Sequence, residues 1–303
     1  EGNLISGNGT GVFIGSGTSV VVAGNLIGTD ASGALALGNT AYGVNVSNSG
    51  TTARIGTNAD GTSDALERNI FAANTTASLL FDSADNSVVQ GNTFGVNATQ
   101  TSVIASTLAI HLSVGADNNR IGTNGDNTRD AAEGNLIVAG TTAVLLDNGG
   151  VGAAPSGNSI SGNTIGKVGT LGGFSNAAMI IRNGANANII GANGDGSLRE
   201  ANEGNTISGN SDDAIRVQDS ASLANRISGN SIFNNGTTAA HLGIDLVGVD
   251  GVNANDGGDP DPGPNTLQNF PIVISAGDAA VSGTLNSTLS TANFRVEVYA
   301  NET

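Results

Sequence analysis

The chain has 303 residues but no cysteine and no tryptophan, and only 10 basic residues stand against 26 acidic ones. The absence of cysteine excludes disulfides and thiolate-ligated metals. The formal net charge of −16 argues against nucleic-acid binding through a basic patch and disfavours an anionic membrane surface as a partner. No apolar run approaches the roughly 20 residues that span a bilayer, so we expect no membrane insertion.

Aromatic residues are also scarce, at 3% of the chain, and charged residues make up only 12%. Hydrophobic residues nevertheless account for 38%, which is enough for a core and argues against general disorder. With so few aromatic rings, that core must be built from isoleucine, leucine, valine and alanine.

The sequence repeats itself. A Glu-x-Asn segment starts at Glu1, Glu67, Glu133 and Glu203, so a large unit recurs about every 66–70 residues. Within each large unit a shorter Gly-Asn-x-Ile unit recurs, as in Gly24-Asn-Leu-Ile-Gly28. This nesting predicts coils of about 22 residues, three to each large repeat.

Short alternating strands with Asn and Gly corners predict an all-β fold, a parallel β-solenoid of about 11 stacked coils. Asparagines that recur at one corner should form ladders of side-chain amides from coil to coil. Apolar residues of successive units should stack, with Ile5 near Ile27 and Ile207 near Ile227. The patterns of a leucine-rich repeat and of a propeller blade are both missing.

Two further stretches are Gly28-Thr-Asp-Ala-Ser-Gly-Ala-Leu-Ala-Leu-Gly-Asn39 and the region from Leu242-Gly-Ile-Asp-Leu246 to Gln268-Asn-Phe-Pro271. With the Asn-x-Ile-x-Gly-Asn units, they resemble right-handed parallel β-helix repeat proteins, which are large secreted or surface proteins of bacteria. The resemblance covers about residues 1–275 and implies the fold and an extracellular or cell-surface location. It does not select a function, because this fold carries lyases, hydrolases, epimerases, adhesins and passive stalks.

Composition divides the chain into three parts. Residues 1–246 form the solenoid, 247–266 an acidic loop rich in proline, glycine and asparagine, and 267–303 an antiparallel β segment that begins a further domain. We expect strands of this last part within 271–275, 281–285 and 294–299. Three longer loops, at 57–67, 123–133 and 193–203, should project from one face about three coils apart.

The acidic loop is the best candidate for a ligand site. Its oxygen-bearing side chains are Asp250, Asn253, Asn255, Asp256, Asp259 and Asp261. Calcium takes six to eight oxygens, and flexible Asp/Asn/Gly loops supply them, so calcium is the cofactor that this segment suggests. The spacing does not fit an EF-hand, and a solvated, turn-rich linker is the alternative.

The pair Asp212-Asp213 resembles the Asp-Asp step of polygalacturonase-type glycosidases, in which inverting hydrolysis needs an acid and a base carboxylate in one groove. The other motifs of that family are missing: where an Asn-x-Asp is expected one coil before the pair, the chain offers only Asn186-Ala-Asn188, no Gly-His-Gly follows the pair and no Arg-x-Lys comes later. A corner of the ordinary coil pattern is the alternative interpretation. His111 alternates with Ile110 and Leu112, so we expect it on the solvent side of a strand.

Pectate-type lyase chemistry is disfavoured because it needs a basic residue, and Lys167 is the only lysine in a chain whose charge repels a polyuronate. The leading hypothesis is therefore a non-enzymatic extracellular rod, structural or adhesive, within a larger surface assembly or filament. We expect neighbouring copies to meet it end to end through uncovered strand edges. A polysaccharide-acting enzyme and a glycan-binding module, with cell-surface polysaccharide as partner, are the alternatives.

Overall fold

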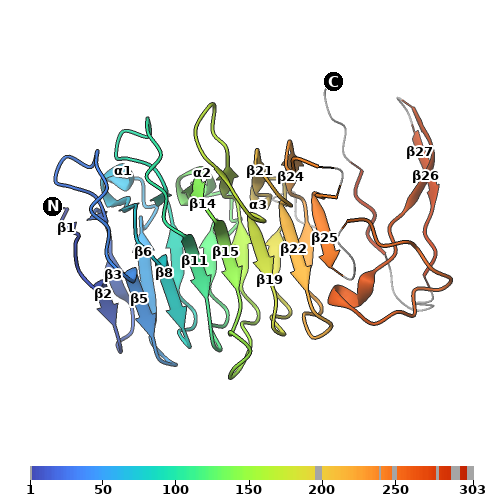
Figure 1. The fold of residues 1–303 in the computed structure, drawn as a ribbon, viewed down its shortest axis with the longest axis horizontal. Coiled ribbons are helices and arrows are strands. Elements are labelled where there is room, and N and C mark those ends of the chain that lie inside the picture. Colours follow the sequence, from blue (N-terminus) through green and yellow to red (C-terminus); the bar gives the residue numbers. More distant parts are fainter. Residues whose placement is uncertain are drawn as a thin grey trace.

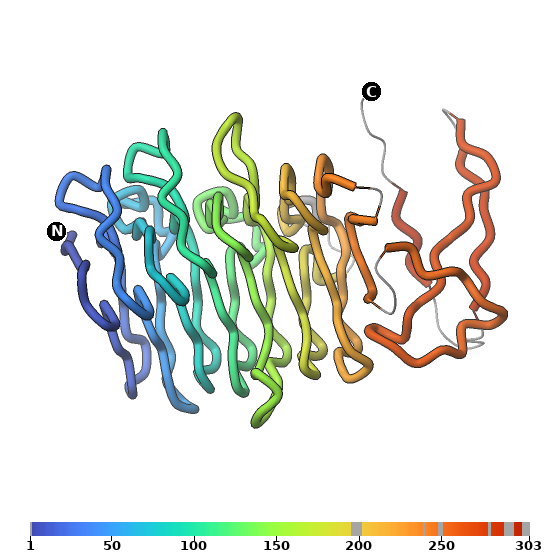
Figure 2. The backbone as a smooth tube through the Cα atoms, in the orientation of Figure 1, coloured from blue at the N-terminus to red at the C-terminus, as the bar shows by residue number. Residues whose placement is uncertain are grey.

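The computed structural model describes residues 2–194, 200–238, 240–247, 251–277, 280–287 and 294–298. Three long parallel sheets, which we name A, B and C, run the length of the solenoid, and the C-terminal hairpin lies beyond them (Figure 1). The chain visits them in turn and then starts the next coil, which is the arrangement of a parallel β-helix (Figure 2). The predicted fold class is confirmed.

Sheet A contains eight strands: β1 (Leu4–Ile5), β4 (Leu26–Ile27), β7 (Ile70–Phe71), β10 (Thr93–Phe94), β13 (Leu136–Ile137), β17 (Thr164–Gly166), β21 (Thr206–Ser208) and β24 (Ser231–Phe233). Sheet B also contains eight: β2 (Thr10–Ile14), β5 (Tyr42–Ser47), β8 (Ala77–Asp82), β11 (Leu108–Leu112), β15 (Thr142–Leu146), β19 (Met179–Ile181), β22 (Ile215–Gln218) and β25 (Ile244–Val247). Sheet C contains seven: β3 (Val20–Val22), β6 (Ala53–Gly56), β9 (Val88–Gln90), β12 (Arg120–Gly122), β16 (Ser159–Ser161), β20 (Ile189–Gly191) and β23 (Arg226–Ser228).

The smaller elements lie in loops and in the C-terminal part. Three single-turn helices, α1 (Asp64–Glu67), α2 (Asp130–Glu133) and α3 (Glu200–Glu203), precede strands of sheet A. A short parallel pair joins β14 (Ala139–Gly140) to β18 (Gly173–Phe174). A 3₁₀ turn, η1 (Pro264–Leu267), precedes an antiparallel hairpin of β26 (Ile272–Gly277) and β27 (Ala280–Thr284).

The number of coils differs from the expectation. Sheets A and B each have eight strands in the described part of the chain, so the solenoid has eight coils rather than about eleven. Successive strands of sheet A start at positions 4, 26, 70, 93, 136, 164, 206 and 231, so short coils alternate with much longer ones. Each large repeat therefore holds two coils, and the extra length of the longer coil forms loops outside the sheets.

The core is a set of stacked apolar rows. In sheet A, Ile5 pairs with Ile27 as predicted, and the rings of Phe71 and Phe94 stack 4.7 Å apart between their centroids. The expected neighbour of Ile207 was wrong, because Ile207 pairs with Ile165 and Ile232.

Ile227 belongs instead to sheet C, where it pairs with Ile190. The same Asn-x-Ile unit precedes strands of both sheets, so the motif alone does not distinguish the two sheets.

An asparagine ladder runs along the corner before sheet A. Each side-chain amide donates to the carboxamide oxygen of the next member at 2.9–3.1 Å. The members are Asn3, Asn25, Asn69, Asn92, Asn135, Asn163, Asn205 and Asn230. We call this the first ladder. It satisfies buried polar groups in every coil and aligns the coils in one register.

The first two predicted strands of the C-terminal part are present as β26 and β27, but residues 294–298 form no strand and Tyr299 lies outside the described residues. No helix in the described residues is long and apolar enough to cross a membrane.

Candidate functional site

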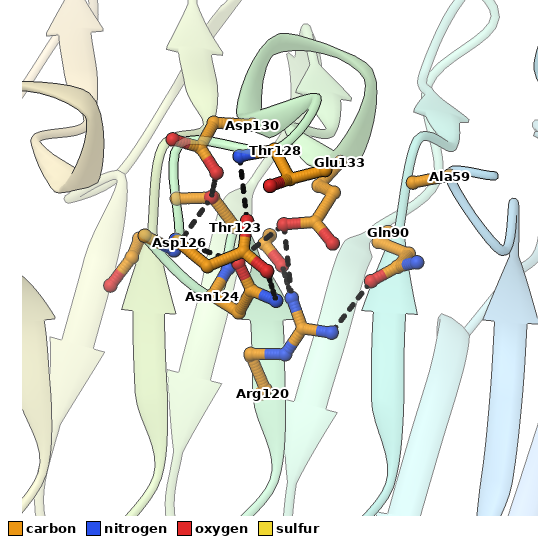
Figure 3. A network of polar contacts seen from close by, with 12 residues as sticks. Ala59, Gln90, Arg120, Thr123, Asn124, Asp126, Thr128, Asp130 and Glu133 are labelled. Atoms are coloured by element: carbon orange, nitrogen blue, oxygen red, sulfur yellow. Dashed lines mark hydrogen bonds and ion pairs between the residues drawn. The ribbon is translucent and has the colours of Figure 1, made fainter. Parts of the chain in front are cut away.

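The three longer loops, which we call the helix loops, carry a repeated polar network, and Figure 3 shows its second copy. In the second copy, Arg120 Nη1 donates to the carbonyl of Gly122 at 2.7 Å and lies 3.4 Å from Glu133 Oε2. Its Nη2 donates to Gln90 Oε1 of the preceding coil at 2.8 Å. Glu133 Oε2 also accepts the Asn124 backbone N–H at 2.9 Å, so this carboxylate closes its own loop rather than facing a ligand.

The first copy repeats the arrangement, because Arg54 Nη1 lies 3.5 Å from Glu67 Oε2, which accepts the Asn58 backbone N–H. In the third copy Ile189 replaces the arginine, but Glu203 Oε2 still accepts the Asn193 backbone N–H at 2.8 Å.

Neighbouring helix loops also touch one another. Arg129 Nη1 lies 4.0 Å from Asp64 Oδ2 of the first loop. Asn202 of the third loop donates to Asn127 Oδ1 at 2.7 Å and to Asp130 Oδ2 at 3.1 Å in the second. The loops precede the third, fifth and seventh strands of sheet A, so they lie two coils apart rather than three.

The Asp212-Asp213 pair forms ion pairs with the side chain of Arg216. Arg216 Nη2 lies 2.6 Å from Asp212 Oδ1, and Arg216 Nε donates to Asp213 Oδ2 at 2.8 Å. Burial alone would lower the pKa of Arg216, but the hydrogen bonds and charges of Asp213 and Asp212 outweigh it and raise that pKa. The Asp213 side chain is fully buried and also accepts the Leu242 backbone N–H.

This geometry suits a structural ion pair better than a catalytic dyad. A general acid or base must reach a substrate, whereas the Asp213 side chain is buried and paired with Arg216. His241 Nε2 lies 3.6 Å from Asp212 Oδ1, but its Nδ1 accepts the Thr237 backbone N–H at 3.1 Å.

His111 projects on the opposite side of β11 from Ile110 and Leu112, as predicted. Its ring is half-buried rather than solvated, and Nε2 lies 3.0 Å from the Asp147 carbonyl oxygen. This burial lowers the pKa of His111.

The acidic loop brings three of its six candidate ligands together. Asp256, Asp259 and Asp261 each place a carboxylate oxygen within 4.8 Å of the others. Asn253 donates instead to the carbonyl of Leu246, and Asp250 lies outside the described residues. The Asn255 side-chain amide donates to the Phe270 carbonyl at 2.8 Å, and its Oδ1 accepts the Phe270 backbone N–H at 2.9 Å.

Two of the three residues, Asp256 and Asp259, are held by Asn269, a residue that the sequence pattern did not single out. Its side chain is buried; its Oδ1 accepts the Asp256 backbone N–H at 3.0 Å, while its own backbone N–H donates to Asp259 Oδ1 at 2.9 Å. Asp261 Oδ1 is buried and has no hydrogen-bond partner in the described part of the chain. An oxygen in that position fits a cation ligand, since buried polar atoms otherwise find a partner.

No family model, no curated protein and no solved structure matches this chain.

Proposed function

We propose that this chain is a non-enzymatic rod, structural or adhesive, that forms one segment of a larger assembly outside the cell or on its surface. The first ladder carries this proposal, because it continues without interruption from Asn3 to Asn230 through all eight coils. At a strand spacing of about 4.8 Å, eight coils make a stack on the order of 40 Å long.

Two further features support stiffness. The helix loops contact one another along one side of the stack through Arg129–Asp64 and Asn202–Asp130. Carboxylates such as those of Glu133 and Asp213 form hydrogen bonds within the chain rather than facing a substrate. A solenoid in which each coil is bonded to its neighbours suits a spacer better than a hinge.

We also propose that copies associate end to end. β1, β2 and β3 are edge strands of their sheets, and edge strands are templates for strand addition. Immunogold electron microscopy of the intact source cells tests the proposed location: label on extracellular or surface structures supports it, and label confined to the cell interior would reject it.

A calcium ion held by the acidic loop is a second candidate function. The buried, unpartnered Oδ1 of Asp261, beside Asp256 and Asp259, favours it. Carboxylates and carbonyl oxygens are the ligands that calcium prefers, and the ion would offset the repulsion of three close negative charges.

A polysaccharide-acting enzyme that uses Asp212 and Asp213 remains the alternative function. Replacing both residues with asparagine and measuring sugar release from neutral and acidic polysaccharides tests it. Sugar release by the parent chain that is lost in the double variant would overturn the rod proposal.

A further inference from the structure

The outer face of sheet A changes character along the rod. Its outward row is Leu4, Leu26, Ile70, Thr93, Leu136, Thr164, Thr206 and Ser231, in paired register. The row is mostly apolar over the first five coils and carries only hydroxyl side chains over the last three. Isoleucines behind these hydroxyls, such as Ile165 and Ile207, still fill the core, so the change concerns only the surface.

Loops cover the apolar part of this face. After strands β4 and β10, hairpin loops at residues 29–38 and 96–105 fold over it and meet where the Ala98 N–H donates to the Gly33 carbonyl at 2.9 Å. Gly33 lies so close to Ala98 and Leu26 that an added Cβ would come within 2.6 Å of the Ala98 Cβ. Ile70 and Thr93 of the outward row are buried, whereas Leu4 at the end of the row is 47% exposed.

The third hairpin loop, after β17, is shorter. A second ladder lies at the corner before sheet B, where the side-chain amides of Asn8 and Asn39 each donate to the next asparagine and the Asn74 backbone N–H donates to Ser106. Each hairpin loop runs from the glycine at the end of the sheet A strand to the residue at this corner position. The first two segments, from Gly28 to Asn39 and from Gly95 to Ser106, have the same length. The third segment runs from Gly166 to Phe174, which occupies the same corner position. Its loop is therefore shorter and covers less of the sheet.

The third loop also leans toward the preceding coil. Leu171 packs against a cluster that includes Val138 and Ala139 of that coil. The hydroxyl side chains of Thr164, Thr206 and Ser231 are left exposed or half-exposed.

The uncovered region is a cavity of about 740 Å³, within the range of about 300–1,000 Å³ that is usual for small-ligand sites. We call it the sheet A groove and define it by Thr164, Lys167, Thr206, Ser208, Phe233 and Asn234. Phe233 is held on strand β24 with 46% of its surface exposed, so it offers a ring to a ligand. Lys167, the only lysine of the chain, makes no ion pair within the described residues.

The hydrogen-bonding groups of the groove are available. The hydroxyls of Thr164, Thr206 and Ser208 and the side-chain amide of Asn234 make no hydrogen bond to the described parts of the chain. The hydroxyl of Ser6, which occupies the row of Ser208 in the first coil, is instead bonded to the Thr29 carbonyl at 2.6 Å. Hydroxyls and amides can both donate and accept, which matches the hydroxyl groups of a sugar.

We propose that the sheet A groove binds an oligosaccharide with widely spaced carboxylates. Phe233 packs against the apolar face of a pyranose ring, the hydroxyls and Asn234 bond its hydroxyl groups, and Lys167 pairs with a carboxylate. The net charge of −16 repels a densely charged polymer over long range, so neutral sugars must separate the charges. The binding does not depend on whether the chain acts as a rod.

Calorimetric titration with two probes tests the proposal. Hyaluronan tetrasaccharide alternates glucuronic acid with N-acetylglucosamine, and chitotetraose holds N-acetylglucosamine alone. We expect hyaluronan tetrasaccharide to bind more tightly than chitotetraose at low salt. Lys167→Gln should remove that difference, and Lys167→Arg should keep most of it.

Phe233→Ala should weaken binding of both probes at least tenfold, whereas Phe13→Ala should leave it unchanged. Phe13 is a matched control because it is an exposed phenylalanine on a different sheet, at 65% exposure. Circular dichroism confirms that each variant is folded. No heat from either probe at millimolar concentration, or binding that survives both Phe233→Ala and Lys167→Gln, would overturn the proposal.

Discussion

Asn265 completes a ladder that begins inside the solenoid. Its side-chain amide donates to the Asn225 carbonyl at 2.7 Å, and its Oδ1 accepts the Asn225 backbone N–H at 2.9 Å. In the same corner of the preceding coils, Asn225 Oδ1 accepts a hydrogen bond from the Asn188 side-chain amide, and Asn188 Oδ1 accepts one from the Asn158 side-chain amide. The acidic loop that the composition marks as a linker therefore contains a residue that takes the place of the next coil.

We predict that Asn265→Ala destabilises the C-terminal end of the solenoid. The change leaves the buried backbone N–H of Asn225 without its acceptor, which costs roughly 1–3 kcal/mol. Urea titration followed by circular dichroism measures the loss. Asn255→Ala is a matched control in the same loop, where both side-chain hydrogen bonds are exposed; an equal effect of both changes would contradict a special role for Asn265.

Ile207→Ala should lower the free energy of unfolding by about 2–5 kcal/mol, because the Ile207 side chain is fully buried and its loss leaves a cavity between Ile165 and Ile232. Chemical denaturation measures the change. Val21→Ala is the comparison, since Val21 is 53% exposed and should cost well under half as much. Equal costs would show that the row is not the core.

The stability should depend on pH through His111. Burial lowers the pKa of His111 in the folded chain below the usual 6.5, so the unfolded chain binds a proton at a pH where the folded chain does not. Stability is then fully present above pH 6.5 and declines as the pH falls through 6.5 toward the folded-state pKa. Thermal melts between about pH 7.5 and 5.5 measure this slope.

His111→Gln should flatten that slope relative to the parent chain. His241→Gln makes the same chemical change at the other histidine and should leave the His111 contribution in place. An unchanged slope in His111→Gln would show that the histidine does not contribute.

Calcium should raise the melting temperature of the chain, and chelation should lower it. A ligand that binds only the folded state stabilises it by about 2.7 kcal/mol at a concentration one hundred times its dissociation constant. Asp261→Asn should abolish the response, whereas Asp30→Asn, in a hairpin loop that closes on its own carboxylate, should keep it. Melting curves that are identical with calcium and with chelator would reject the site.

The sequence predicts the stacked fold because the repeated asparagines and apolar residues fit one arrangement of the chain. An isoleucine or phenylalanine in every coil, with asparagine two residues before it, fits a coil with a buried face and a ladder at its corner, and Ile5 beside Ile27 follows directly. The number of coils does not follow. Loops such as residues 29–38 also carry glycine and alternating leucines, so their sequence resembles that of a coil.

The sequence likewise predicts one candidate site but not the others. The acidic trio Asp256, Asp259 and Asp261 is visible as a local run of oxygens, because the residues are close in sequence. Asn269 and the sheet A groove are not visible, because each depends on chain segments that meet only after folding. The shortened loop that opens the groove can be recognised only once Phe174 is known to occupy the ladder position of Ser106.

The distance between the two edges of sheet B tests the rigid rod most directly. The chain has no cysteine, so Phe13→Cys on β2 and Ile244→Cys on β25 give unique positions for a pair of spin labels, both at exposed residues. Seven strand spacings of about 4.8 Å separate these strands, which places their backbones on the order of 34 Å apart. A rigid rod predicts one narrow distance distribution near this value, widened only by the label tethers; a broad or multiple distribution in the folded, doubly labelled chain would contradict it.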